Sequence, residues 1–287
     1  MVSLRWAPML ALLAWTPPFT LGTPIDPNSQ SDNPAQILRR ALPMFKNFPP
    51  GSPKKGALEQ AFKDLPVVVN GVLKSDGATY DTIFAKYFKP QHRDAVKQVF
   101  QNMVSPADHD ASTGADIFAT IQIDADDYLS TKPCDKTAVA YTNNWVTQPT
   151  QMHFCDSNVR NAYAFPDLSE ITCDKLGPTV SDKMLSLGGY ALLHEVSHFN
   201  KVSQGPITPF NQPQNEVGDY GYGPQKTRQL LQEPSDRVVA NADSYAWFAN
   251  EVYWSNKCGH GFGAPTDNSF TPPGVCTDPN KDNCLLM

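Results

Sequence analysis

The chain has 287 residues, a net charge of −6 and a pI near 5.5. A nucleic-acid binder usually shows a basic stripe, and this acidic chain has none, so we expect no nucleic-acid partner. Hydrophobic residues make up 40% of the chain, which is enough for the core of one large domain or two small ones, whereas its 26 prolines predict long loops.

The N-terminal segment has the features of a secretory signal peptide. One arginine, Arg5, precedes a short apolar run, and small residues within 20–23 offer a cleavage site. The run is too short to span a membrane, and no later segment reaches the required length. An uncleaved anchor is the alternative, but Pro17-Pro18 would disrupt a longer helix. We therefore predict a signal peptide at 1–22, a secreted, extracellular protein and no membrane contact.

Residues 23–34 are polar and contain proline, so they predict a flexible leader. Arg39-Arg40 follows and has two interpretations. It is either a processing site or the solvent-facing side of a short helix, because the apolar residues at 37, 38, 41 and 42 have helical spacing.

The middle of the chain predicts helices followed by strands. Apolar residues recur at helical spacing in three segments, and three later segments read as strands bounded by Asp, Pro and Asn. The predicted helices cover 57–65, 79–88 and 91–104, and the predicted strands cover 117–123, 137–141 and 151–155. We therefore expect a helical layer and then a small sheet.

Residues 191–199 contain a His-Glu-x-x-His motif in a run that predicts a helix. His194 and His198 then lie on one helix face, one turn apart, where both imidazoles can reach a single Zn²⁺. Glu195 lies on the flank of that face, where its carboxylate can act as general base on a water molecule. The alternative is an ordinary buried helix with two hydrogen-bonded histidines.

The boundaries of this helix follow from its neighbours. Ser181-Asp182 predicts its N-terminal cap, while Gly188-Gly189 either weakens the helix or marks close packing against another element. The stretch from 199 to 225 is rich in Gly, Pro and Asn and predicts a loop. A last helix is predicted from about 236 to 256, and residues 259–287 predict a loop-rich extension.

A catalytic zinc usually has three protein ligands, so two histidines do not complete the site. The third ligand is expected among carboxylates downstream, and spacing alone does not choose among them. The candidates are Glu216, Asp219, Glu233, Asp236, Asp243 and Glu251.

The chain has six cysteines, an even number that predicts three disulfides in a secreted protein. No two of them form a Cys-x-x-Cys pair, which argues against a cysteine-ligated zinc finger. His153 lies in a predicted strand between Met152 and Phe154, so we expect a structural or solvent-facing role for it rather than metal ligation.

Downstream of the central motif the chain resembles the deuterolysin family, the aspzincins, which are fungal secreted metalloendopeptidases. That family combines His-Glu-x-x-His with a later Gly-Thr-x-Asp-x-x-Tyr-Gly. Here Asp219, Tyr222 and Gly223 match the second motif, whereas Glu216-Val217 replaces its leading Gly-Thr. The family's Asn-Ala-Asp-Ser-Tyr stands intact at 241–245, and 86–89 is similar to its early helical region.

The resemblance implies an α+β, zincin-like fold over residues 35–258, with an N-terminal helical layer, a small twisted sheet, an active-site helix and a C-terminal helix. It implies that His194, His198 and Asp219 ligate zinc, that Glu195 activates the water, and that Tyr222 faces the oxyanion. The implied disulfides are Cys134 with Cys155 and Cys173 with Cys258, which leaves Cys276 and Cys284 to pair. We expect a monomer that cleaves proteins or peptides.

Several alternatives stay open. The third ligand would be Glu216 or Glu233 in a gluzincin-like site. Tyr222 is otherwise a packed loop aromatic, and Asp243 either holds a ligand histidine in place or makes a helix-cap or core hydrogen bond. A different class of function is a secreted zinc-binding or surface-interaction protein with this fold and little or no turnover.

Overall fold

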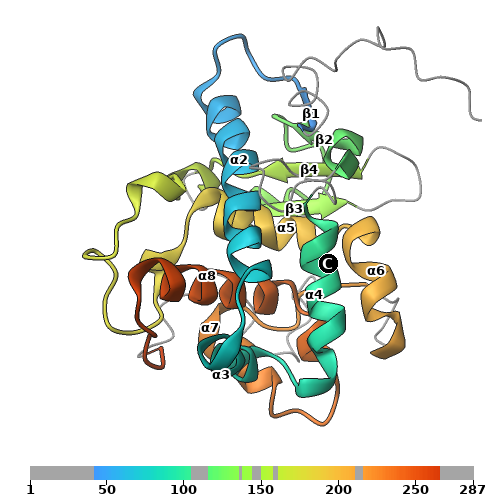
Figure 1. The fold of residues 1–287 in the computed structure, drawn as a ribbon. Coiled ribbons are helices and arrows are strands. Elements are labelled where there is room, and N and C mark those ends of the chain that lie inside the picture. Colours follow the sequence, from blue (N-terminus) through green and yellow to red (C-terminus); the bar gives the residue numbers. More distant parts are fainter. Residues whose placement is uncertain are drawn as a thin grey trace, which may run out of the picture.

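The computed structural model describes residues 42–104, 116–135, 138–143, 150–157, 161–210 and 216–265. The predicted signal peptide and leader, Arg39-Arg40 and the cysteine pair Cys276 and Cys284 lie outside these residues. Figure 1 shows helix α2 (Pro53–Leu73) running beside a small sheet, with most of the other helices below the sheet.

The N-terminal helical layer is confirmed. It consists of α2 (Pro53–Leu73), α3 (Gly77–Tyr87) and α4 (Arg93–Asn102). Helix α2 starts at a favourable N-terminal sequence, because the Ser52 hydroxyl accepts a hydrogen bond from the Lys55 amide and Pro53 occupies the first turn. It continues well past 65, with Pro66 inside it, since the valines of its second half are buried in the core.

The sheet has four strands: β1 (Met44–Lys46), β2 (Ile121–Asp124), β3 (Ala140–Asn143) and β4 (Thr150–Phe154). Their order is β1-β2-β4-β3, with β3 antiparallel to β4 and the other pairs parallel. The first strand was not predicted, because its three residues are a strand only through pairing with β2. Residues 116–120 form a 3-10 turn rather than the start of the predicted strand.

One face of this sheet packs on the helices and carries the apolar side chains. Ile121, Ile123 and Met152 are fully buried there. Because side chains alternate along a strand, Thr142, whose partner across the ladder is Met152, lies on this same face. The polar side chains of Asp124 and neighbouring residues lie on the other face. The register therefore directs Thr142 of an outer strand toward the helical layer.

The C-terminal half contains α5 (Leu193–Ser197), α6 (Asn200–Ile207), α7 (Gly223–Leu230) and α8 (Ala242–Cys258). Helix α6 corrects the loop that the Gly, Pro and Asn content of 199–225 predicted. Pro206 lies in the last turn of the helix, and the side chains of Val202 and Ile207 are buried. Helix α8 starts later than predicted, because Asn241 is extended and its backbone pairs with Gly218.

The predicted cap of the central helix at Ser181-Asp182 is wrong. Residues 182–184 form a separate 3-10 turn, and the helical run begins with a π-helical segment, Leu187–Leu192, that leads directly into α5. Its cap is Ser186, whose hydroxyl accepts from the Gly189 amide at 2.9 Å. Single π-helical turns are often found at functional sites.

The two glycines in that segment mark close packing, as one of the two interpretations held. A Cβ atom on Gly188 would lie 2.5 Å from the carbonyl oxygen of Ala61 in α2. Only glycine therefore lets α2 approach this closely. Asn250 of α8 donates to the Gly189 carbonyl at 2.7 Å from the other side. The segment before α5 is thus fixed between α2 and α8.

The structure contains both disulfides that the resemblance implied among the described cysteines, Cys134 with Cys155 and Cys173 with Cys258. The second ties the last residue of α8 to a loop 85 residues earlier in the chain. Within the described ranges, no helix has the length and apolar character that a membrane crossing requires.

Candidate metal centre

The site forms at the end of α5, which packs between β3 and α8. His194 lies in α5 and His198 directly follows it with helical backbone angles, so their rings stand on one face with centroids 5.0 Å apart. Asp219, from the segment between α6 and α7, completes the group. Its Oδ1 lies 3.0 Å from His194 Nε2 and 3.5 Å from His198 Nε2. The side chains that sequence reasoning proposed as ligands therefore meet.

Hydrogen bonds to the Nδ1 atoms fix the orientation of the two histidine rings. His198 Nδ1 lies 2.7 Å from the carbonyl oxygen of Val217, and His194 Nδ1 lies 2.9 Å from Asp243 Oδ1. A carbonyl or an ionised carboxylate only accepts, so Nδ1 carries the proton in each neutral ring. In this tautomer Nε2 of each ring faces Asp219 and can bind a metal ion. This is the arrangement that protein partners impose on metal-binding histidines.

The donor set fits zinc. Asp219 Oδ1 is buried and makes no hydrogen bond of proper geometry, and the three donor atoms lie within 4.8 Å of one another. Leaving such an oxygen unpaired in the interior is costly unless a cation binds it. Two imidazoles and one carboxylate, with a position left for water, are typical of catalytic zinc sites. His194, His198 and Asp219 are thus the residues that could hold the metal.

The charges of these groups shift their pKa values strongly. Burial raises the pKa of the Asp219 carboxyl, but the neighbouring His198 and His194 outweigh burial and hold that pKa well below its usual range. Burial lowers the pKa of His194 and of His198, while the Asp219 carboxylate more than reverses this. A histidine ring binds a metal only in its neutral form, so metal affinity depends on pH.

Glu195 is held by a residue that sequence reasoning missed. Thr142 of β3 donates its hydroxyl proton toward Glu195 Oε2 at 2.7 Å, and the Glu195 carbonyl lies 3.1 Å from the same hydroxyl. Burial raises the pKa of the Glu195 carboxyl, against the opposing effect of His198 and His194. The predicted strand ended at 141, one residue before Thr142, and no local signal links these positions, which are 53 residues apart.

Asp243 satisfies both interpretations that the sequence left open. Its Oδ1 accepts from His194 Nδ1 and, at 2.8 Å, from the Tyr190 hydroxyl. Its Oδ2 accepts from the Gly223 amide at 2.5 Å and from Trp247 Nε1 at 3.1 Å. The carboxylate is fully buried, and four donors compensate its charge. It therefore joins α8 both to a candidate ligand and to Gly223, the first residue of α7 after the segment that carries Asp219.

Tyr222 stacks on the candidate ligand. Its ring lies 5.7 Å from that of His194, with 14° between the planes. Burial, followed by the Asp219 carboxylate, raises the pKa of its phenol well above the usual value. The phenol is therefore protonated at neutral pH and can donate a hydrogen bond.

The remaining candidate carboxylates have other partners. Glu251 is fully buried and accepts from Lys86, Tyr87 and Arg228. Asp236 pairs with His92 and Lys89. Glu216 accepts from Asn200 at 3.2 Å, and Glu233 lies 3.4 Å from the Ser235 hydroxyl. None of these four belongs to the group of potential ligands formed around His194 in the described part of the chain.

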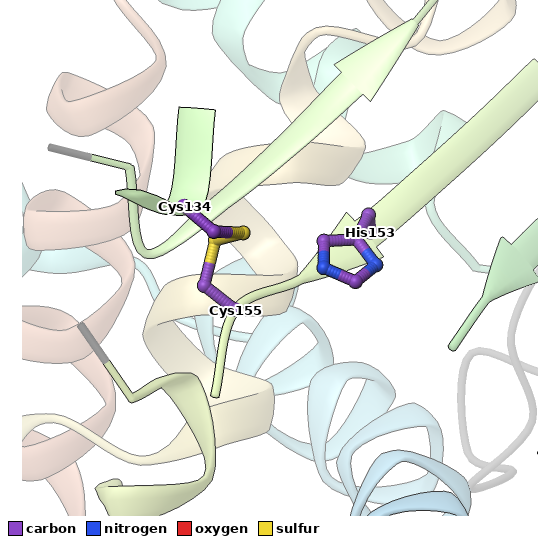
Figure 2. A group of neighbouring side chains, drawn as sticks. All are labelled: Cys134, His153 and Cys155. Carbon is purple, nitrogen blue, oxygen red and sulfur yellow. A yellow bond between two sulfur atoms is a disulfide. The ribbon is translucent and has the colours of Figure 1, made fainter. Parts of the chain in front are cut away.

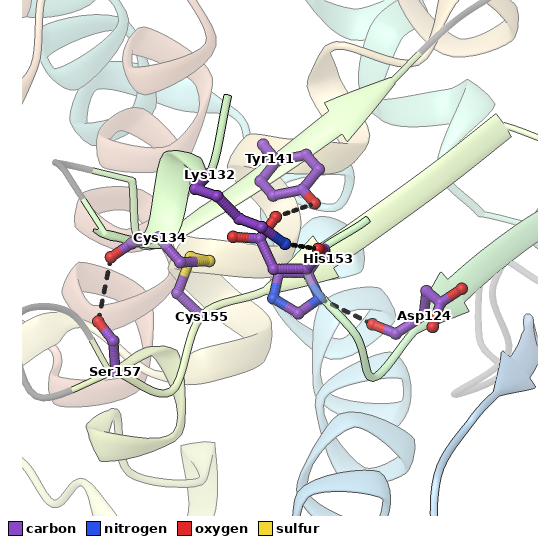
Figure 3. Close-up of a disulfide and its surroundings, with 8 residues drawn as sticks. Asp124, Lys132, Cys134, Tyr141, His153, Cys155 and Ser157 are labelled. Atoms are coloured by element: carbon purple, nitrogen blue, oxygen red, sulfur yellow. Dashed lines mark hydrogen bonds between the residues drawn. A yellow bond between two sulfur atoms is a disulfide. The ribbon is translucent and has the colours of Figure 1, made fainter. Parts of the chain in front are cut away.

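A second group of potential ligands lies on the sheet: Cys134, His153 and Cys155, whose donor atoms also lie within 4.8 Å of one another (Figure 2). The two sulfur atoms form a disulfide, so neither is a thiolate that could bind a metal. His153 Nδ1 lies 2.9 Å from the Asp124 carbonyl oxygen, on the side of the ring that faces away from the disulfide (Figure 3). The expected structural role of His153 agrees with these contacts.

The chain is also similar to a known protein family and to a solved structure. The model of a family described as lysine-specific metallo-endopeptidase, the aspzincins, matches residues 71–250. Among solved structures, the chain is similar to a zinc peptidase from Grifola frondosa, with 20% sequence identity, a TM-score of 0.43, and coverage of 72% of this chain and 98% of that one. No curated protein matches the chain.

Proposed function

The chain belongs to the aspzincin family of zinc metalloendopeptidases, and we propose that His194, His198 and Asp219 hold its zinc ion. The predicted family, the zincin-like α+β fold and the zinc cofactor are thereby confirmed. The observation that carries the ligand assignment is the convergence of the two Nε2 atoms on Asp219 Oδ1, with both Nδ1 atoms already engaged. A peptidase of this family acts on peptide substrates.

We assign the proton transfers to Glu195. A zinc ion held at this site supplies Lewis acidity, which lowers the pKa of a water molecule toward 7 and polarises the scissile carbonyl. Glu195 accepts a proton from the attacking water while the water oxygen bonds to the carbonyl carbon. It then passes the proton to the departing amine nitrogen as the carbon–nitrogen bond breaks. Because Thr142 binds Oε2, we assign these transfers to Oε1.

Tyr222 is the proposed donor to the oxyanion. Its phenol is protonated and its ring is fixed against His194, so the hydroxyl is held at the edge of the ligand group. A donor fixed in advance where negative charge develops lowers the barrier without reorganisation. A packed loop aromatic would not need a hydroxyl, so Tyr222→Phe separates the two roles.

The substrate would bind along β3. This strand pairs with β4 on one side and is the last strand of the described sheet, and its Thr142 touches the proposed base. An extended peptide can add to such an edge through main-chain hydrogen bonds, which recognise any sequence. This position would bring a scissile bond next to Glu195.

We propose that the protein is secreted and acts as a monomer outside the cell. In this proposal 1–22 is a signal peptide, 23–34 is a leader, 35–258 is the peptidase domain and 259–287 is an extension. The two disulfides support an oxidising compartment, since cytosolic proteins rarely keep them. Mass spectrometry of the protein from culture medium, with N-terminal sequencing, tests the cleavage site. An intact N-terminus would contradict it.

The test of function compares wild type with Glu195→Gln, which keeps the shape and the acceptor for Thr142 but cannot take a proton. We expect one zinc per chain in both proteins and peptide hydrolysis in the wild type alone. Retention of full activity in Glu195→Gln would refute the assigned base. Bound zinc with hydrolysis in neither protein would favour a zinc-binding protein without turnover.

A further inference from the structure

Asp219, the third potential ligand, lies on a less regular part of the backbone than the two histidines. His194 and His198 are fixed by a helix, but Asp219 lies in a non-helical segment between α6 and α7. Given the proposed zinc ligands, on which this inference rests, we propose that Asn241 is a positioning residue that fixes the Asp219 segment for metal binding.

The Asn241 side chain forms hydrogen bonds with the two residues that directly follow Asp219. Its Oδ1 accepts from the Tyr220 amide at 2.8 Å and from the Gly221 amide at 2.9 Å. Its Nδ2 donates to the Gly221 carbonyl at 3.0 Å. The Tyr220 amide belongs to the peptide unit that begins at Asp219, so the first of these bonds fixes the orientation of that unit. One side chain thus determines the path of the segment just after the donor.

The hydrogen-bonding capacity of Asn241 is fully used. Besides the three bonds to the segment, Nδ2 donates to the Ser244 hydroxyl at 3.0 Å, and the residue is fully buried. A carboxamide offers two acceptor positions and two donors on one short stem. An aspartate would lose both donors, and a serine hydroxyl would be too short to reach two successive amides. The site therefore requires asparagine chemistry.

Backbone hydrogen bonds also fix Gly218, the residue just before Asp219. The Gly218 amide donates to the Ala240 carbonyl at 2.8 Å, and the Ala242 amide donates to the Gly218 carbonyl at 3.0 Å. Asp243, two residues after Asn241, binds His194 and the Gly223 amide. Residues 240–243 consequently set the Asp219 donor and the His194 donor relative to each other.

The test measures zinc affinity by competition with a chromophoric chelator and thermal unfolding of the metal-free protein. Asn241→Ala is expected to weaken zinc binding by about 10-fold or more, the range found when groups that orient metal ligands are removed. Tyr245→Phe is the matched control. It removes one buried hydrogen bond from the same helix, to the Val239 carbonyl at 2.7 Å, without touching the Asp219 segment. It should lower the unfolding temperature but leave zinc affinity unchanged.

A second variant covers the case in which Asn241→Ala does not fold. Asn241→Ser keeps a residue that is favoured before a helix, so α8 should still start at Ala242. It should bind zinc as weakly as the alanine variant. Wild-type zinc affinity in either folded variant, combined with a lower unfolding temperature, would overturn the proposal and leave Asn241 a purely structural residue.

Asp219→Ala, measured in the same way, separates this inference from the proposed function. If that variant loses zinc affinity and the Asn241 variants do not, the ligand assignment stands and the inference fails. If Asp219→Ala binds zinc like the wild type, the ligand assignment itself fails.

Discussion

Two groups of side chains in the described part of the chain each bring three potential ligands within 4.8 Å of one another, but they differ in their chemistry. Around His194, hydrogen bonds engage Nδ1 of both histidines, and both Nε2 atoms face Asp219 Oδ1. Around His153, the two sulfur atoms are bonded to each other. Both groups thus bring potential ligands close together, but only the group around His194 consists of side chains that can all bind a metal ion. The bonds that these side chains make to their other neighbours, rather than the distances between them, distinguish the candidate metal centre.

The largest difference in zinc content and activity is expected between variants that replace one histidine of each group by alanine. His198→Ala should lose zinc and lower kcat/KM by about 1,000-fold or more, because the several kcal/mol that a metal contributes to the transition state disappear. His153→Ala should keep one zinc and near wild-type kcat. Metal analysis and peptide hydrolysis on both variants check this. Loss of zinc in His153→Ala would show that the second group takes part in metal binding.

The next effect concerns the hydrogen bond between Thr142 and Glu195, the proposed base. Thr142→Val keeps the side-chain shape and removes the hydroxyl that binds Glu195 Oε2. A hydrogen bond to a charged group contributes about 1.5 to 3 kcal/mol, so kcat should fall roughly 10-fold to 100-fold with KM and zinc content little changed.

Thr142→Ser supplies the control because it keeps the hydroxyl, and it should recover most of kcat. If the serine variant is as slow as the valine variant, packing of the methyl group explains the loss, and the hydroxyl has no positioning role.

The disulfide group should respond through stability alone. Replacing Cys134 and Cys155 by serine opens a loop of 21 residues. Loop-closure entropy predicts a loss of about 3 kcal/mol in the free energy of unfolding, with zinc stoichiometry unchanged. Urea unfolding and metal analysis of the purified variant measure both quantities. A drop in zinc content under native conditions would mean that the two groups are coupled.

The smallest effect concerns a third buried histidine. His92 Nε2 pairs with Asp236 at 2.9 Å, and burial lowers the pKa of His92, against the opposing effect of Asp236. Below its unfolded pKa of about 6.5 the unfolded chain binds more protons than the folded one, so this group makes stability fall as pH decreases from there. Unfolding midpoints at several pH values should show a shallower fall for His92→Asn. An identical pH dependence in both proteins would contradict this.

Much of the helical layer follows from the sequence, because its apolar spacing is local. The errors have non-local causes. Helix α6 was missed since Gly205-Pro206 resembles a loop, and β1 is a strand only through pairing with β2. The start of the central helix was misplaced because its π-helical turn depends on contact with Ala61 of α2.

The candidate site shows the same division. The spacing of His194, Glu195 and His198 is local and predicts their common face. Spacing did not choose Asp219 from six carboxylates, and only the resemblance to a family did so. Thr142 and the contacts of Asn241 could not be found in the sequence, because each joins elements that are far apart in the chain.

The most direct measurement is X-ray diffraction at the zinc absorption edge on crystals of the zinc-loaded protein. We predict one anomalous peak about 2.0 to 2.2 Å from His194 Nε2, His198 Nε2 and an Asp219 carboxylate oxygen. A peak ligated by Glu216 or Glu233 in place of Asp219, or a peak beside His153, would contradict it.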